Sequence, residues 1–130
     1  MALKSLSQGI KISISLSVTT AFERYMEKIS WSESKFNMVD FMSFWKEYII
    51  NQSSWYTQID DSIKEDSQFH QDLADKINGI IIKILNEKPT KEQMKMIDSH
   101  VKITGEQLEY SCKMEAKYII NHIGKSSILH

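Results

Sequence analysis

The chain has 130 residues, of which 42% are hydrophobic and 25% charged, and its formal net charge is −1. A chain of this length forms one domain and buries roughly two-thirds of the surface that its unfolded form exposes. Arg24 is the only arginine among 16 basic residues. Because nucleic-acid binding favours arginine and a basic excess, the composition argues against a nucleic-acid partner.

The first residues predict neither a secretion signal nor a membrane span. Lys4 supplies a positive charge, but Gly9 and Lys11 interrupt the apolar run that follows it. No stretch approaches the roughly 20 apolar residues that a bilayer requires. Cys112 is the only cysteine, so no internal disulfide can form. We expect a cytoplasmic protein whose residues 1–9 are frayed.

Residues 10–18, I-K-I-S-I-S-L-S-V, alternate between apolar and polar side chains, which is typical of a strand. The same residues also fit a helix, because apolar side chains recur at steps of four from Ile10 to Met26. No second strand is evident elsewhere, and an isolated strand is unstable. The pattern favours a helix from about Ser13 to Ile29 and leaves open a strand that pairs across a dimer.

The middle of the chain predicts a buried helix and then a short one. Residues 37–51 carry apolar and aromatic side chains on two faces, so this helix is expected at the centre of the core. The polar residues 52–54 interrupt it. Apolar side chains from Trp55 to Ile63 then predict a short helix that ends in the acidic run near Asp66.

Residues 67–87 predict a further helix with one wide apolar stripe. Gly79 lies in its middle and costs about 1 kcal/mol of helix propensity. A glycine at such a position often permits close approach by another helix or a ligand. Pro89 ends this helix.

Residues 89–124 contain two helix-start signatures, Thr90-Lys-Glu-Gln93 and Thr104-Gly-Glu-Gln107, spaced 14 residues apart. In each, the threonine hydroxyl can cap a backbone N–H while the glutamine reaches back. The signatures predict a short helix that carries His100, a bend at Thr104-Gly105, and a long helix to about His122. The whole chain is thus predicted to be all-α, with five to six helices around one core in a single domain, residues 1–130.

Candidate catalytic chemistry is weak. His100 lies on a short helix where a globin would carry its haem ligand, but a partly exposed or hydrogen-bonded histidine is the interpretation that we prefer. Cys112 is expected to be a small buried side chain, because no activating partner is evident. The acidic residues Asp60, Asp61, Glu65 and Asp66 are expected to form a solvated rim. We therefore predict no enzyme, no catalytic residue and no metal site, and we regard haem as unlikely.

Seven methionines and three tryptophans are compatible with either of two cores. One is an adaptable apolar cavity, because methionine tolerates irregular ligand shapes. The other is a solid methionine-rich core. On the last helix, a second partly apolar face predicts a dimer interface formed by Tyr110, Met114, Lys117 and Tyr118.

Two stretches carry a resemblance to known families. Residues 97–116, I-D-S-H-V-K-I-T-G-E-Q-L-E-Y-S-C-K-M-E-A, resemble the later helices of bacterial sensor globins. Residues 36–49, F-N-M-V-D-F-M-S-F-W-K-E-Y-I, resemble the first core helix of haem-free globin domains in stress-response regulators. In size and order of segments, the chain is similar to the haem-free sensor domains of sporulation histidine kinases and to the plasmid-encoded sporulation inhibitory proteins.

This resemblance implies a globin-like bundle without haem that holds a fatty-acid-like chain in an apolar tunnel, with a halide nearby. It also implies a homodimer that draws a signal away from a sporulation histidine kinase. We expect the tunnel between the helices of residues 37–51, residues 67–87 and His100. Its predicted lining comprises Phe41, Trp45, Ile77, Ile81, Ile97, Val101 and Leu108. The alternative is a helical dimeric adaptor or inhibitor protein with a solid core and no small-molecule ligand.

Overall fold

The computed structural model describes residues 6–52 and 55–129, and within these ranges it is all-α, with no strand. The predicted all-α class is therefore confirmed. None of the described helices is long and apolar enough to cross a membrane. The elements are α1 (Gln8–Lys28), η2 (Glu33–Lys35), α2 (Met38–Gln52), η3 (Tyr56–Gln58), α3 (Asp61–Lys64), α4 (Ser67–Asn86), α5 (Lys91–Thr104) and α6 (Lys113–Leu129).

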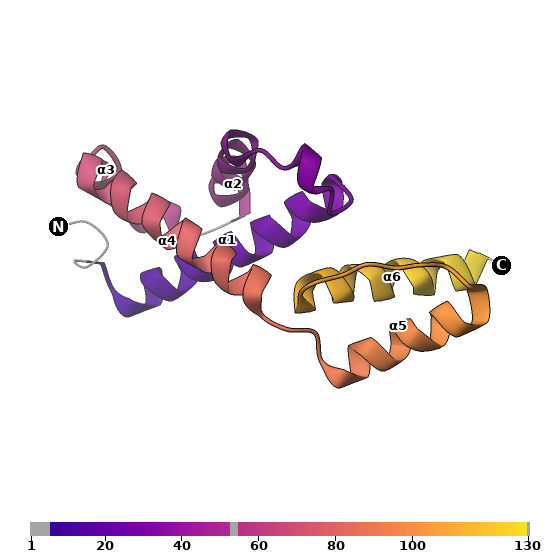
Figure 1. Ribbon diagram of the computed structural model, residues 1–130. Helices are drawn as coiled ribbons and strands as arrows, with labels where there is room; N and C mark the ends of the chain where they lie inside the picture. The colour runs from indigo at the N-terminus through magenta and orange to yellow at the C-terminus, as the bar shows by residue number, and fades with distance from the viewer. Residues whose placement is uncertain (1–5, 53–54, 130) are drawn as a thin grey trace. The chain divides into compact units, whose positions relative to one another are not determined.

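The chain divides into two compact units, Met1–Ile81 and Ile82–His130. The first unit contains α1, α2, the short helices η2, η3 and α3, and most of α4 (Figure 1). The second contains the last residues of α4 together with α5 and α6.

Helix α1 resolves the ambiguity of residues 10–18 in favour of a helix, and the strand alternative is wrong. The helix begins at Gln8, earlier than the predicted Ser13, because the Ser7 hydroxyl accepts a hydrogen bond from the Ile10 N–H at 3.2 Å. Residues 8 and 9 are therefore helical and not frayed, while residues 1–5 lie outside the described part of the chain. Ile14 and Val18 are fully buried on the stripe predicted from the four-residue spacing.

The end of α1 is a tight corner made by two residues in left-handed backbone conformations, Ser30 (φ 56°) and Trp31 (φ 55°). The Ser30 N–H donates to the Glu27 carbonyl at 3.0 Å, and the Trp31 N–H donates to the Met26 carbonyl at 2.8 Å. This pair of bonds is the Schellman arrangement, in which glycine usually occupies the first of these positions. The Trp31 ring packs edge-on against Phe22, with ring centroids 6.2 Å apart. The corner leads the chain into η2 and then α2.

The core of the first unit is the packing of α1 against α2. Phe41 of α2 lies fully buried, edge-to-face with Phe22 (5.7 Å between centroids) and Tyr25 (5.6 Å). Each such pair contributes about 0.5–1.5 kcal/mol beyond the burial of its area. Trp45, one turn further along α2, is 2% exposed, and its indole N–H donates to the Ser17 hydroxyl of α1 at 3.2 Å. Helix α2 is therefore buried along one stripe and not on the two faces predicted from its sequence, because Met38, Val39 and Ile50 are exposed.

The segment after α2 differs from the single short helix predicted there. It forms η3, an extended residue at Ile59 and the four-residue α3. Helix α4 follows at Ser67, the predicted start. Gly79 is exposed, and no heavy atom of the described residues lies within 4 Å of a Cβ built on it. The prediction that Gly79 permits close approach is therefore not supported within this structure.

The first of the two helix-start signatures forms as predicted. The Gln93 N–H donates to the Thr90 hydroxyl at 3.1 Å, and the Thr90 N–H donates to the Gln93 side-chain oxygen at 3.0 Å, so the capping box is complete. The second signature does not begin a helix. Thr104 is the last residue of α5, and Gly105 follows in the left-handed conformation with φ 75°. The bend is therefore confirmed, but the long helix from Thr104 is wrong.

The physical reason lies in the Thr104 hydroxyl and in Gly105. The hydroxyl donates to the His100 carbonyl at 2.9 Å and accepts from the Glu106 N–H at 3.2 Å, so it acts at the end of α5. The Gly105 N–H donates to the Val101 carbonyl at 2.8 Å, which completes a glycine C-cap. Helix α6 begins only at Lys113, where the Glu115 carboxylate accepts from the Ser111 N–H at 2.9 Å.

Residues 105–112 form a non-helical strap that returns from the end of α5 to the start of α6 (Figure 1). Eight extended residues reach at most about 26–29 Å, and a 14-residue helix such as α5 is about 21 Å long. The strap can therefore span the whole length of α5, and the two helices run in the same direction. Their first residues are joined, because the Gln93 side chain donates to the Lys113 carbonyl at 3.2 Å. The Lys113 N–H in turn donates to the Glu87 carbonyl at 2.8 Å.

Two glycine substitutions should have opposite effects on stability. Gly79→Ala should raise the free energy of unfolding by about 1 kcal/mol, because the site is helical, exposed and free of steric conflict. Gly105→Ala should lower it by roughly 1–2 kcal/mol, because an L-residue is strained at φ 75°. Chemical denaturation of the purified variants measures both. Equal effects of the two substitutions would contradict the described backbone.

The two helix-start signatures should also differ when they are disrupted. Thr90→Ala should destabilise the protein by about 1 kcal/mol, because it removes a formed cap. Gln107→Ala is the matched control from the second signature and should change the free energy of unfolding by less than about 0.5 kcal/mol. Urea denaturation followed by far-UV circular dichroism compares them. If Gln107→Ala lowered the free energy of unfolding as much as Thr90→Ala, the result would support a long helix that begins at Thr104.

Candidate functional site

The tryptophan cavity is a hollow of about 390 Å³ in the first unit, within the range typical of small-molecule sites. It lies among α2, η3, α3 and the first turns of α4. Its lining is mostly apolar and aromatic, with three basic side chains. The lining residues are Met42, Trp45, Lys46, Ile49, Ile50, Trp55, Tyr56, Lys64, Phe69, His70 and Leu73.

The deep walls of this cavity are held rigidly. Trp45 and Trp55 are 2% and 3% exposed, and their rings lie 6.2 Å apart at 31°. The Ser17 hydroxyl that accepts from Trp45 donates in turn to the Ile14 carbonyl at 2.7 Å. Phe69 of α4 is also buried and lines the same cavity. Aromatic walls fixed in this way present a pre-formed apolar surface.

The buried Trp55 N–H has no hydrogen-bond acceptor among the described residues. Buried polar groups are nearly always paired, with protein, water or a ligand. The Trp55 ring lines the tryptophan cavity and also a smaller one of about 200 Å³ next to α1. The ring therefore contributes an apolar face to both hollows, while its N–H is shielded from solvent.

Lysines lie at the more exposed part of the tryptophan cavity. Lys46 is exposed on α2, and Lys64 of α3 places its ammonium 4.2 Å from the centroid of the Tyr56 ring. The Lys64 ammonium also lies 3.6 Å from the Asp61 carboxylate, which is itself almost fully exposed. An exposed ion pair of this kind is weak, so Lys64 can exchange it for another anion. The cavity thus combines an apolar interior with cationic groups.

The seven side chains predicted to line a tunnel belong to both units. Trp45 lines the tryptophan cavity. Phe41, Ile77 and Ile81 are buried in the first unit, where Phe41 belongs to the aromatic core. In the second unit, Ile97 is buried, whereas Val101 and Leu108 are half-buried. The role of all seven in ligand binding stays a prediction.

Sequence reasoning did not single out most of the lining residues. Ile49, Trp55, Phe69 and Leu73 read as ordinary helical core positions, and nothing in their spacing indicates that four segments meet around a hollow. The available signal was the aromatic pair Trp55-Tyr56 directly after a polar break. Among the methionines considered for a cavity wall, Met42 lines this cavity, whereas Met38, Met94 and Met96 are exposed.

The predicted dimer residues all lie in the second unit. Tyr110 is on the strap, and burial and the Asp98 carboxylate raise the pKa of its hydroxyl. Met114 and Tyr118 of α6 are half-buried, and the Tyr118 ring lies 4.2 Å from the ring of His122. Lys117 is exposed. Their role in an interface stays a prediction.

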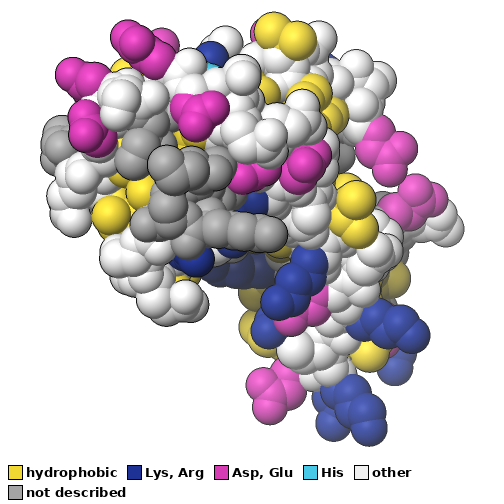
Figure 2. Space-filling view, turned by 90° about the vertical axis from the view of Figure 1, so that its left-hand side faces the viewer, with side chains coloured by type: hydrophobic (Ala, Val, Ile, Leu, Met, Phe, Trp, Pro, Cys, Tyr) yellow, Lys and Arg dark blue, Asp and Glu magenta, His cyan; other side chains and the backbone are white. Residues whose placement is uncertain are grey.

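His100 and the acidic residues near Asp60 do not form a catalytic or metal site among the described residues. The His100 imidazole lies 3.4 Å from the Glu106 carboxylate, so it fastens the start of the strap to α5. Asp60, Asp61 and Glu65 are exposed, as expected of a solvated rim, whereas Asp66 is half-buried and its carboxylate accepts from the Gln68 N–H at 2.9 Å. Across residues 6–52 and 55–129, no three His, Cys, Asp or Glu side chains gather as a metal site would require. On the face that Figure 2 shows, acidic side chains are scattered and Lys or Arg side chains gather in the lower part.

Comparison with known proteins gives no match: no protein-family model, no curated protein and no solved structure matches this chain. The resemblance to haem-free sensor domains therefore depends on the quoted residues alone.

Cys112 should be chemically silent in the folded protein. Its side chain is fully buried, and burial raises the pKa of the thiol above its ordinary value of 9.0. Ellman's reagent should therefore react slowly with the native protein and quickly after unfolding in urea. The raised pKa also means that its contribution to stability is complete below pH 9 and is lost as the pH rises further.

A Cys112→Ala variant should lack that alkaline loss and is the control for it. Fast thiol modification of the native protein would contradict the described burial.

Proposed function

We propose that this protein is a non-catalytic binding protein that holds an apolar chain with an acidic head group in the tryptophan cavity. The observation that carries the proposal is the combination of a hollow of about 390 Å³, aromatic walls and two lysines in one lining. An apolar tail gains free energy by leaving water for such walls, at about 0.8 kcal/mol per buried CH₂. The lysines then favour a carboxylate head over a neutral one.

The depth of the cavity fits the tail of such a ligand. Trp45, Trp55 and Phe69 are at most 3% exposed, so their faces on the cavity are shielded from bulk water. Trp55 contributes its ring to these walls. Lys46 and Lys64 lie on α2 and α3, where an acidic head could meet both. A fatty acid has this distribution of apolar and acidic groups.

We further propose that binding serves signalling, as the resemblance to haem-free globin-like sensor domains and sporulation inhibitory proteins implies. A free sensor that binds the ligand of a sporulation histidine kinase lowers the free ligand concentration. Mass action then shifts the kinase toward its ligand-free state without any catalysis. A homodimer, or a mixed dimer with the kinase sensor, would also shift the equilibrium between the ligand-bound and ligand-free kinase.

Solvent extraction of the purified protein, followed by mass spectrometry, tests for the ligand directly. We expect a fatty acid in near-stoichiometric amount. The delipidated protein should then bind myristate with a change in tryptophan emission, because Trp45 and Trp55 line the cavity. Myristyl alcohol, which lacks the charge, should bind more weakly than myristate.

Variants separate the head-group contribution from the tail contribution. Lys46→Gln combined with Lys64→Gln should weaken myristate binding about tenfold or more, since two charge-assisted contacts are lost, and should leave the alcohol unaffected. Lys83→Gln, an exposed lysine of α4 in the second unit, is the matched control and should change neither. No extracted lipid together with no response to myristate would reject the proposal.

That negative result would favour the second candidate, a helical adaptor or inhibitor that acts through its surface. Two exposed apolar side chains on α5 favour it: Met96 is 57% exposed and Ile103 is 84% exposed. They lie seven residues apart, two turns along the same side of the helix. Such an adaptor would need no small ligand.

A further inference from the structure

The charged side chains that line the tryptophan cavity are all of one sign. They come from three elements: Lys46 from α2, Lys64 from α3 and His70 from the first turn of α4. None of the described lining residues is acidic. An acidic head group in this cavity therefore meets only neutral side chains and basic ones that attract it.

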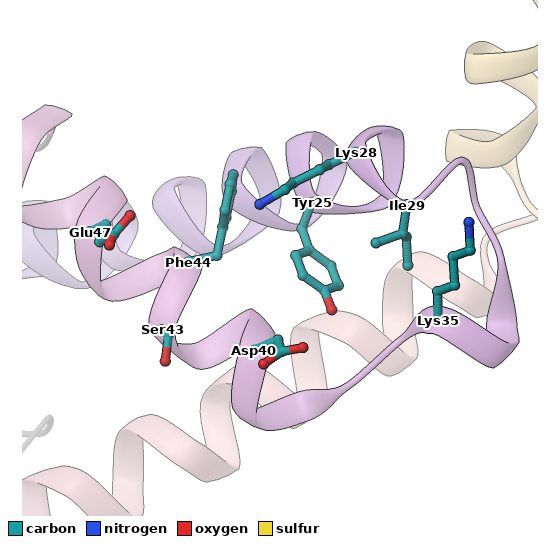
Figure 3. A pocket seen from close by; sticks show the side chains of 8 residues that line it. All are labelled: Tyr25, Lys28, Ile29, Lys35, Asp40, Ser43, Phe44 and Glu47. Atoms are coloured by element: carbon teal, nitrogen blue, oxygen red, sulfur yellow. The ribbon is translucent and has the colours of Figure 1, made fainter.

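A second hollow of the first unit has a different distribution of charge. Its volume is about 320 Å³, and it lies between the end of α1, the connector with η2 and the first half of α2 (Figure 3). Its charged lining residues are Lys28, Lys35, Asp40 and Glu47. The two lysines lie apart from each other, and the two carboxylates lie at opposite ends of the hollow (Figure 3). This mixture favours neither an anion nor a cation, in contrast to the lining of the tryptophan cavity.

His70 is the basic lining residue that the proposed function has not used. Among the residues that the structure describes, its imidazole forms no ion pair and no hydrogen bond. Its ring contacts that of Phe69, with centroids 6.1 Å apart. Phe69 is a buried wall of the tryptophan cavity, whereas His70 is exposed. These two neighbours therefore extend from the apolar interior to the part of the lining that solvent reaches, where a charged head group belongs.

The charged surroundings of His70 are mainly basic. The titratable groups that share the lining with it are Lys46 of α2, Tyr56 of η3 and Lys64 of α3. On α4 itself, the acidic residue one turn earlier is Asp66, whose carboxylate accepts from the Gln68 N–H at 2.9 Å. Asp61 lies 3.6 Å from the Lys64 ammonium. In the empty cavity the lysines repel a protonated His70, and an acidic head group bound among them would relieve that repulsion.

We infer that His70 is a third contact for the acidic head group and makes ligand binding depend on pH. Histidine is the side chain that gains its positive charge between pH 8 and pH 5. A protonated His70 adds a cation beside the two lysines, so the affinity for an anionic ligand rises as the pH falls through this range. By linkage, binding of the anion takes up protons. This inference rests on the proposed function, because it requires an acidic amphiphile in the tryptophan cavity.

Binding of tetradecanesulfonate to the delipidated full chain, followed by tryptophan emission between pH 5.5 and pH 8, tests the inference. The sulfonate head stays ionised over this range, so any change in affinity comes from the protein. We expect about two- to fivefold tighter binding at pH 5.5 than at pH 8, as for one added ion pair at an exposed group. Myristyl alcohol has no charge and should bind equally at both pH values.

Histidine variants assign the effect to one residue. His70→Gln should remove the pH dependence and still bind the sulfonate at pH 8. His122→Gln, at an exposed histidine of α6 in the second unit, is the matched control and should keep the pH dependence. Calorimetry at pH 6.5 in two buffers with different heats of ionisation is the second measurement. The wild-type protein should take up a fraction of a proton on binding the sulfonate, and His70→Gln should take up none.

The outcomes distinguish this inference from the proposed function. If the sulfonate binds with the same affinity at every pH, or if the pH dependence persists in His70→Gln, the role of His70 is wrong and the proposed binding site stands. If neither the sulfonate nor the alcohol binds at any pH, the proposed function is rejected and this inference with it. Because His70 is exposed, its variant should fold, which circular dichroism verifies.

Discussion

The hydrogen bond from the Trp45 indole to the Ser17 hydroxyl is the interaction on which the first unit depends. Ser17 is a polar residue buried on α1, and its hydroxyl both accepts from Trp45 and donates to the Ile14 carbonyl. Loss of either partner would leave a buried polar group unpaired, which costs about 1–3 kcal/mol. The bond therefore fixes the register of α2 on α1. With that register set, the aromatic core gathers around Phe41 and the tryptophan cavity opens beside Trp45.

Two ambiguous segments show how far the sequence can predict the fold. Residues 10–18 alternate like a strand but are helical, because the Ser7 cap begins a helix whose four-residue spacing continues to Met26. The helix-start signature at Thr104 predicts that residues 108–112 are helical, yet they form part of the strap. The same stretch also alternates, with Leu108, Tyr110 and Cys112 less exposed than their neighbours. In both segments, the helix cap determines the secondary structure: Ser7 begins α1, and Gly105 ends α5. The spacing of the apolar residues does not distinguish the alternatives.

Gly105 shows the corresponding limit for helix-start signatures. The sequence T-G-E-Q satisfies a capping box, but Thr-Gly also satisfies the end of a helix. Which of the two forms depends on whether glycine adopts the left-handed conformation, and Gly105 does so, with φ 75°. At Thr90 there is no such conflict, because Pro89 precedes it and no helix runs into it. The first signature was therefore predictable, whereas the second was not.

The cavity was less predictable than the fold for a geometric reason. On α2, the buried stripe Phe41, Trp45 and Ile49 was evident from the sequence, and the prediction took lining residues from such stripes. The hollow uses Trp45 and Ile49 of that stripe together with its edge, where Met42, Lys46 and Ile50 follow at steps of four. Positions at an edge are half-buried or exposed, so periodicity assigns them to the surface. These positions line a cavity only because Trp55 and α4 lie opposite them.

The parallel course of α5 and α6 has an electrostatic consequence. In the usual antiparallel pair, the helix dipoles of neighbours cancel, but here both positive ends lie together, with about half an elementary charge at each. Glu92 and Glu115 stand in the first turns of the two helices. Glu87 lies close to the start of α6, where its carboxylate is 3.8 Å from the Lys113 ammonium. These three carboxylates oppose the field that the strap connection creates, because negative charge is favourable near a helix N-terminus.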